Sequence, residues 1–123
     1  MVGEFGGVGA FLNQWEQVQN GSGKCRSNSP AGSYGHGNTT PTEQASSYVA
    51  MTKLLAANKR DISASVYTQI TDVENECDGF LAYSRQNKFD SADTARILKA
   101  NAALIAAPVA VVAGGKGHIK AQM

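Results

Sequence analysis

The stretch ISASVYTQIT, residues 62–71, decides the fold class because aliphatic or small side chains alternate with mostly polar ones along it. Aliphatic or small residues form one face (Ile62, Ala64, Val66, Thr68, Ile70), and mostly polar residues form the other (Ser63, Ser65, Tyr67, Gln69, Thr71). Since successive side chains of a strand point to opposite faces, this period predicts a strand. We expect the aliphatic face to pack against helices, and the polar face to point into a barrel and carry function near its carboxyl end.

A helix is predicted directly before this strand. Thr40 can cap the helix, Pro41 suits its first position, and Glu43 completes a capping box. Helical spacing then continues from Ala45 and predicts a helix that ends near Asn58.

A second helix is predicted after the strand. It begins at Asp90, whose carboxylate can cap it, and Ala95, Leu98, Ala102 and Ile105 lie on one stripe of it. An acidic loop, residues 72–79, joins the strand to this helix and ends in a turn at Asp78-Gly79. Because helix and strand alternate, the order favours a parallel sheet, and the fold class we expect is α/β with about two barrel units.

The two ends of the chain are less regular. The start GEFGGVG, residues 3–9, is rich in glycine, which lets a backbone turn sharply and approach a ligand closely. Residues 20–41 show neither the helical nor the strand period of apolar residues, so we predict a loop of about 20 residues. Loops of this length are usually functional or disordered. Residues 106–123 fit neither pattern, and we interpret them as a variant or frayed tail.

Composition argues against several classes of partner. With 11 basic and 10 acidic residues and no basic run, nothing indicates a nucleic-acid or anionic-membrane partner. The longest apolar stretch, residues 102–113, is broken by Pro108 and falls short of the roughly 20 residues that span a bilayer. The start of the chain lacks a basic, then apolar, signal sequence. We therefore expect no membrane segment and no visible signal peptide.

The two cysteines, Cys25 and Cys77, lack the spacing of a metal site, so we predict neither a metal nor another cofactor. They could pair in an oxidising compartment, but two free thiols is the interpretation that we favour. Two glycosylation triplets, at Asn20 and Asn38, favour a secreted parent protein without establishing one.

Two segments resemble the family 2 glycoside hydrolases, which include β-galactosidases and β-glucuronidases. They are VGEFGGVG, residues 2–9, and the more specific VYTQITDVENECDGFLAYSR, residues 66–85. Both are similar to the regions around the last two strands of that family's catalytic barrel. The resemblance covers residues 1–105 and implies a partial (β/α)8 barrel, since a complete one takes about 250 residues.

The resemblance implies that Glu4 is the nucleophile of a retaining mechanism. In that chemistry a second carboxyl group, about 5 Å away, protonates the leaving oxygen and later activates water. In this family the second group follows the fourth strand, and this sequence contains no such region. We therefore expect a fragment that recognises the parent enzyme's carbohydrate substrate class but is inactive alone, or else a non-catalytic interaction or truncated gene product.

Five further residues are candidate substrate contacts. Tyr67 and Gln69 would face the barrel mouth and bind sugar hydroxyls, unless they merely fill the interior. Asp72 and Glu74 follow the strand, where a solvated or capping role is the alternative. Trp15 could stack on a sugar ring or be an ordinary partly buried aromatic residue. A phosphate cradle at residues 6–9 is disfavoured, because GGVG matches no nucleotide-binding motif.

Overall fold

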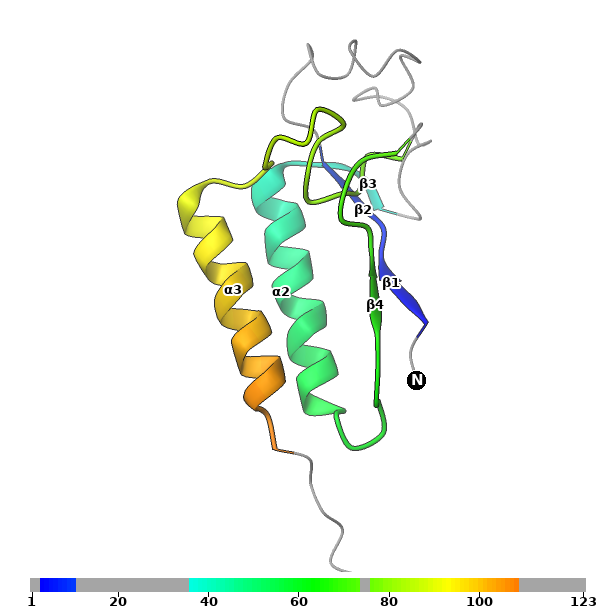
Figure 1. The fold of residues 1–123 in the computed structure, drawn as a ribbon, viewed down its shortest axis with the longest axis vertical. Helices are drawn as coiled ribbons and strands as arrows, with labels where there is room; N and C mark the ends of the chain where they lie inside the picture. The colour runs from blue at the N-terminus through cyan, green and yellow to red at the C-terminus, as the bar shows by residue number, and fades with distance from the viewer. Residues whose placement is uncertain (1–2, 11–35, 74–75, 109–123) are drawn as a thin grey trace, which may run out of the picture.

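The computed structural model describes residues 3–10, 36–73 and 76–108, with the backbone only for residues 36–39. These residues form a mixed α/β arrangement in which α2 and α3 lie side by side along one side of β1 and β4 (Figure 1). The elements, in chain order, are β1 (Glu4–Gly6), β2 (Val8–Ala10), β3 (His36–Thr39), α2 (Pro41–Ala57), β4 (Val66–Thr68) and α3 (Ser91–Ala106).

The strands pair in parallel, as the alternation of helix and strand predicts. β1 pairs with β4, so that Glu4 lies opposite Val66 and Gly6 opposite Thr68, and β2 pairs with β3. The predicted strand at residues 62–71 is confirmed only at its centre, because regular pairing is confined to Val66–Thr68. The described residues form an α/β arrangement of two small sheets and no closed barrel.

The capping signals of α2 produce the predicted helix. Thr40 Oγ1 accepts a hydrogen bond from the Glu43 amide at 3.2 Å, and the Glu43 carboxylate accepts one from the Thr40 amide at 2.7 Å. The Thr40 amide and the Thr40 hydroxyl, which donates to the same carboxylate at 3.0 Å, stabilise its charged form and lower the pKa of Glu43. The helix ends at Ala57, with Asn58 as its C-terminal cap, so both predicted ends are confirmed.

The helix α3 also begins where expected, because Asp90 Oδ1 accepts a hydrogen bond from the Asp93 amide at 2.7 Å. The apolar stripe that the sequence indicated is exposed, since Leu98 and Ile105 are 62% and 79% exposed. The buried positions of α3 are instead Asp93, Ile97 and Ala100. Apolar residues occur on more than one side of α3, so periodicity alone did not identify the side that faces α2.

The predicted faces of β4 are reversed. Tyr67 packs on the helix side, with its ring 4.9 Å from that of Tyr48 on α2, whereas Val66 and Ile70 are 59% and 61% exposed. A buried tyrosine ring removes more apolar area from water than a valine does, so the aromatic side chain takes the covered face. The inward-facing aromatic cluster comprises Phe5, Tyr48, Tyr67, Phe80 and Phe89.

The capping box provides a stability test. Replacing Thr40 by Ala removes the acceptor of the Glu43 amide, and we expect the free energy of unfolding to fall by about 0.5–2 kcal/mol. Urea unfolding followed by circular dichroism measures the change. The matched control is Ser91→Ala, which removes an exposed hydroxyl at the first position of α3, beside the cap rather than at it. Equal effects of the two substitutions would contradict the capping assignment.

Candidate functional site

Glu4 is an exposed carboxylate on the face of β1 that points away from the helices. Its neighbour Phe5 lies in the aromatic cluster, and alternation along a strand places Glu4 and Gly6 on the opposite face. There Glu4, Phe5, Gly6 and Thr68 line a cavity of about 240 Å³. The parallel pairing of β1 and β4 thus places the candidate nucleophile in a small cavity that Thr68 also lines.

The glycine of β1 allows the two strands to approach each other. Gly6 has φ +117°, and a Cβ placed there would lie 2.5 Å from the Thr68 carbonyl oxygen and 2.6 Å from the Tyr67 ring. The Gly7 amide donates a hydrogen bond to the same carbonyl at 2.9 Å. The glycines were predicted to permit close contact with a ligand, and in the structure Gly6 permits close contact with β4.

Gln69 lies in a polar network beyond the end of β4. Its side-chain amide donates to Asp78 Oδ1 at 2.8 Å and to Glu76 Oε2 at 3.3 Å. Two carboxylates therefore fix the orientation of this amide, because only its nitrogen can donate to them. Gln69 does not line the cavity that holds Glu4.

Asp72 forms a buried ion pair. Its Oδ1 accepts hydrogen bonds from Lys88 Nζ at 2.7 Å and from the Gly79 amide at 2.9 Å, and its side chain is 9% exposed. Burial raises the pKa of Asp72 to about 6, although the charge and hydrogen bond of Lys88 and the Gly79 amide act in the opposite direction. The carboxylate is thus ionised at neutral pH, and its contacts are those of a structural residue.

Lys88 and Asp78 are central to this network, and no pattern in the sequence singled them out. The Lys88 ammonium also donates to the carbonyl oxygens of Ala10 at 2.7 Å and Cys77 at 2.9 Å. A lysine between two aromatic or polar loop residues carries no periodic signal. For Asp78, the turn motif Asp78-Gly79 was visible, but a turn does not reveal that its carboxylate is buried.

Three buried polar atoms have no hydrogen-bond partner within the described part of the chain: Gln44 Oε1, Tyr67 Oη and Asp78 Oδ2. Gln44 and Asp78 are neighbours, because Gln44 Nε2 donates a hydrogen bond to the Asp78 carbonyl at 3.0 Å. Burial, followed by the charge of Asp78, raises the pKa of the Tyr67 phenol, with Gln44 opposing the shift. Burial is also the main cause that raises the pKa of Asp78.

The structure separates the candidate residues that the sequence grouped together. Glu4 lies in its cavity with Thr68, Gln69 contacts Glu76 and Asp78, and Asp72 pairs with Lys88. The expected orientation of Tyr67 toward the barrel mouth is wrong, as the ring packs among the core aromatics. Trp15 and Glu74 lie outside the described residues.

Cys77 is disulfide-bonded, so the favoured interpretation of two free thiols is wrong. The other cysteine of the chain, Cys25, lies outside the described residues. Disulfides persist in oxidising environments, and this bond therefore favours the alternative that the sequence left open.

The comparisons with known proteins give no assignment. No protein-family model matches the chain, and no match was found among curated proteins or solved structures. Across residues 3–10, 36–73 and 76–108, no group of three or more His, Cys, Asp and Glu side chains could hold a metal ion. Neither helix of this region has the length and apolar character required to span a membrane.

The two buried aspartates differ in a way that mutagenesis can measure. We expect Asp72→Asn to lower the free energy of unfolding by about 3–5 kcal/mol, because it removes the carboxylate that pairs with the buried Lys88 ammonium at 2.7 Å. Asp78→Asn should be much milder, since an amide oxygen can still accept the hydrogen bond from Gln69 and no buried cation loses its counter-ion. Urea unfolding at pH 7 compares the two variants.

The pH dependence of Asp78 has a defined sign. A folded pKa above the ordinary 3.8 means that the folded state binds this proton more tightly than the unfolded state. The stability of the native chain relative to Asp78→Asn should therefore decrease as pH rises above about 4. Unfolding titrations of both proteins between pH 4 and 8 measure that difference; a difference that increased with pH would contradict the raised pKa.

Proposed function

We propose that this chain is part of a retaining glycoside hydrolase that acts on O-glycosyl bonds of the β-galactoside type, with Glu4 as its nucleophile. The supporting observation is the position of Glu4: an exposed carboxylate in a small cavity, on the side of a parallel strand pair that faces away from the helices. In an α/β barrel that side faces the interior. Barrel catalytic residues lie at the carboxyl ends of the strands, whereas Glu4 is the first residue of β1, so the choice of Glu4 as nucleophile rests on the resemblance. The resemblance of residues 2–9 and 66–85 to family 2 glycoside hydrolases supplies the chemistry.

The proposed chemistry assigns one step to Glu4. Its carboxylate attacks the anomeric carbon, the glycosidic bond breaks, and a covalent glycosyl ester forms, while the leaving oxygen takes a proton from a second carboxyl group that the resemblance assigns to another part of the parent enzyme. Thr68 lines the same cavity and is a candidate contact for a sugar hydroxyl. Gln69 is a second candidate contact, with its amide nitrogen already held by Asp78 and Glu76.

We propose further that the chain does not turn over glycosides alone. The described lining of the Glu4 cavity includes no second carboxyl group, so protonation of a poor leaving group has no donor there. Asp72 and Asp78 are buried and engaged with Lys88 and Gln69, which makes them unsuitable replacements.

A reagent whose leaving group needs no proton can test the nucleophile separately from turnover. We expect 2-deoxy-2-fluoro-β-galactosyl fluoride to label the chain slowly at Glu4, because fluoride departs without a proton donor and the 2-fluoro group slows hydrolysis of the ester. Intact-mass measurement and peptide mapping identify the labelled residue. The corresponding glucuronyl fluoride tests the other sugar class that the resemblance suggests.

Two controls accompany the labelling. Glu4→Gln should abolish the label, whereas Asp61→Asn, at an exposed acid paired with Arg60 after α2, should leave it unchanged. Neither the native chain nor the variants should release aryl alcohol from aryl β-galactosides or aryl β-glucuronides. A folded native chain that resists both fluorides, or is labelled elsewhere, would contradict the role of Glu4. Glu4-dependent release of the aryl alcohol would contradict the expected inactivity.

The second candidate function is a non-catalytic interaction or truncated product derived from a hydrolase. The exposed apolar side chains of Val66, Ile70, Leu98 and Ile105 favour it, because surface of this kind usually marks contacts with further polypeptide. This candidate predicts a folded chain on which neither fluoride reagent forms an ester at Glu4.

A further inference from the structure

Three buried polar atoms from three parts of the chain share the lack of a hydrogen bond. They are Gln44 Oε1 on α2, Tyr67 Oη on β4 and Asp78 Oδ2 in the loop beyond β4, and none has a partner among the described residues. Unpaired polar atoms are rare in protein interiors, because each gives up its hydrogen bonds to water on folding. Three of them on neighbouring side chains indicate a shared partner.

Two of these side chains are fixed by their other polar atoms. Gln44 Nε2 donates to the carbonyl oxygens of Val8, Asp78 and Gly79 at 2.8, 3.0 and 3.2 Å. Since carbonyl oxygens only accept, the amide nitrogen must face them, and Oε1 is the atom left over. Asp78 is held in the same way, because its Oδ1 accepts from Gln69 Nε2 at 2.8 Å and its Oδ2 is left over.

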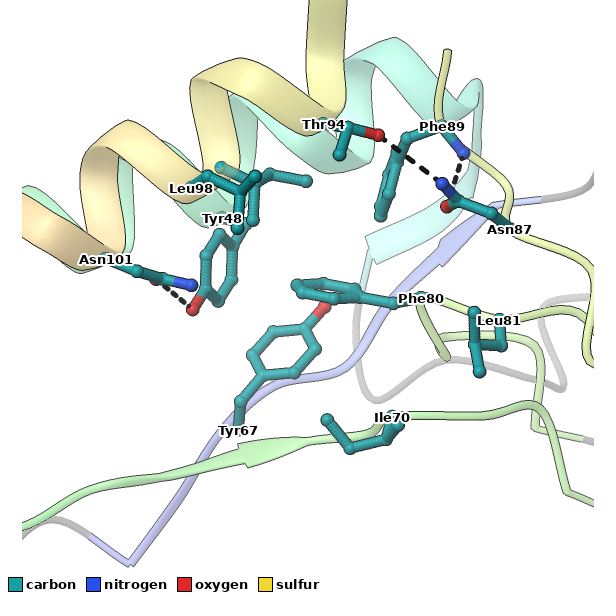
Figure 2. Close-up of a pocket in the computed structure, with 11 residues that line it drawn as sticks. Tyr48, Tyr67, Ile70, Phe80, Leu81, Asn87, Phe89, Thr94, Leu98 and Asn101 are labelled. Atoms are coloured by element: carbon teal, nitrogen blue, oxygen red, sulfur yellow. Dashed lines mark hydrogen bonds between the residues drawn. The ribbon is translucent and has the colours of Figure 1, made fainter. Parts of the chain in front are cut away.

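The phenol of Tyr67 lies near both groups. Its hydroxyl end points away from β4 and toward Phe80, whose ring centroid lies 4.5 Å from that of Tyr67 (Figure 2). Burial and then the charge of Asp78 raise the pKa of this phenol, and the Gln44 side chain lowers it, so both side chains are close to Oη. The phenol nevertheless hydrogen-bonds to neither of them within the described part of the chain. Polar atoms that approach without a direct bond are commonly bridged by water.

The three atoms match the hydrogen-bonding capacity of one water molecule. Gln44 Oε1 and the Asp78 carboxylate oxygen accept only, and the Tyr67 hydroxyl has one proton to donate. A water molecule donates two hydrogen bonds and accepts at least one, and buried waters make about three bonds to otherwise unpaired groups. An ammonium ion fits less well, because it has no lone pair that could accept the phenol proton.

We propose that Gln44 Oε1, Tyr67 Oη and Asp78 Oδ2 together bind one internal water molecule. The water donates to the amide and carboxylate oxygens and accepts from the phenol, and it thereby joins α2, β4 and the loop beyond β4. This inference is independent of the proposed glycoside chemistry, because none of the three residues lines the cavity that holds Glu4.

A crystal structure of the chain, at a resolution that shows ordered water, tests the proposal directly. We expect one density peak at about 2.7–3.2 Å from each of the three atoms. A direct hydrogen bond from Tyr67 Oη to either acceptor, or a peak bonded to fewer than all three atoms, would overturn the proposal. So would an occupant with six or more oxygen neighbours at about 2.3–2.6 Å, since that coordination belongs to a metal cation.

Relaxation of the solvent gives an independent readout in solution, because ¹⁷O relaxation dispersion detects buried waters that exchange slowly. Tyr67→Phe removes the phenol donor and keeps the ring, so the residence time of the proposed water should fall roughly fivefold to tenfold. The matched control is Tyr83→Phe, which removes the hydroxyl of a tyrosine that is 46% exposed and should change nothing. Equal effects in the two folded variants, or no slowly exchanging water in the native chain, would contradict the proposed site.

Discussion

The buried ammonium of Lys88 is the contact on which the arrangement of the loops depends. It joins the carboxylate of Asp72 to the carbonyl oxygens of Ala10 and Cys77, and thereby connects the end of β2 to the loop that follows β4. A lysine 4% exposed is tolerated only when its charge and its donors are matched, and these oxygens provide that match. Gln44 reinforces the same junction from α2, through hydrogen bonds to the carbonyls of Val8, Asp78 and Gly79.

The aromatic cluster determines which side of the strands faces the helices. Phe5 on β1 and Tyr67 on β4 are register partners, and both rings pack toward Tyr48 on α2. Because side chains alternate along a strand, this choice sends Glu4 and Thr68 to the other side. The exposure of Glu4 therefore follows from the burial of its neighbour. The covered side of the sheet supplies stability, and the open side leaves a carboxylate accessible for chemistry.

Local signals in the sequence predicted the elements better than their packing. Thr40, Glu43 and Asp90 act through hydrogen bonds to residues three positions away, so their effect is readable from the sequence, and both helices begin where they indicate. The faces of β4 and α3 depend on partners distant in the chain, such as Tyr48 for Tyr67 and Thr42 for Asp93, and were assigned wrongly. The Lys88 network was missed for the same reason. At the site, the sequence singled out Glu4 through a resemblance, but not the cavity that it shares with Thr68.

The polar network and the Glu4 cavity are structurally separate. Gln69 and Asp78 bond to each other, and Asp72 bonds to Lys88 and to the Gly79 amide, which holds the loop beyond β4. Glu4 takes part in none of these bonds and is exposed on β1. The contacts that hold this loop therefore do not depend on Glu4, so a substitution of Glu4 leaves the bonds of the polar network in place.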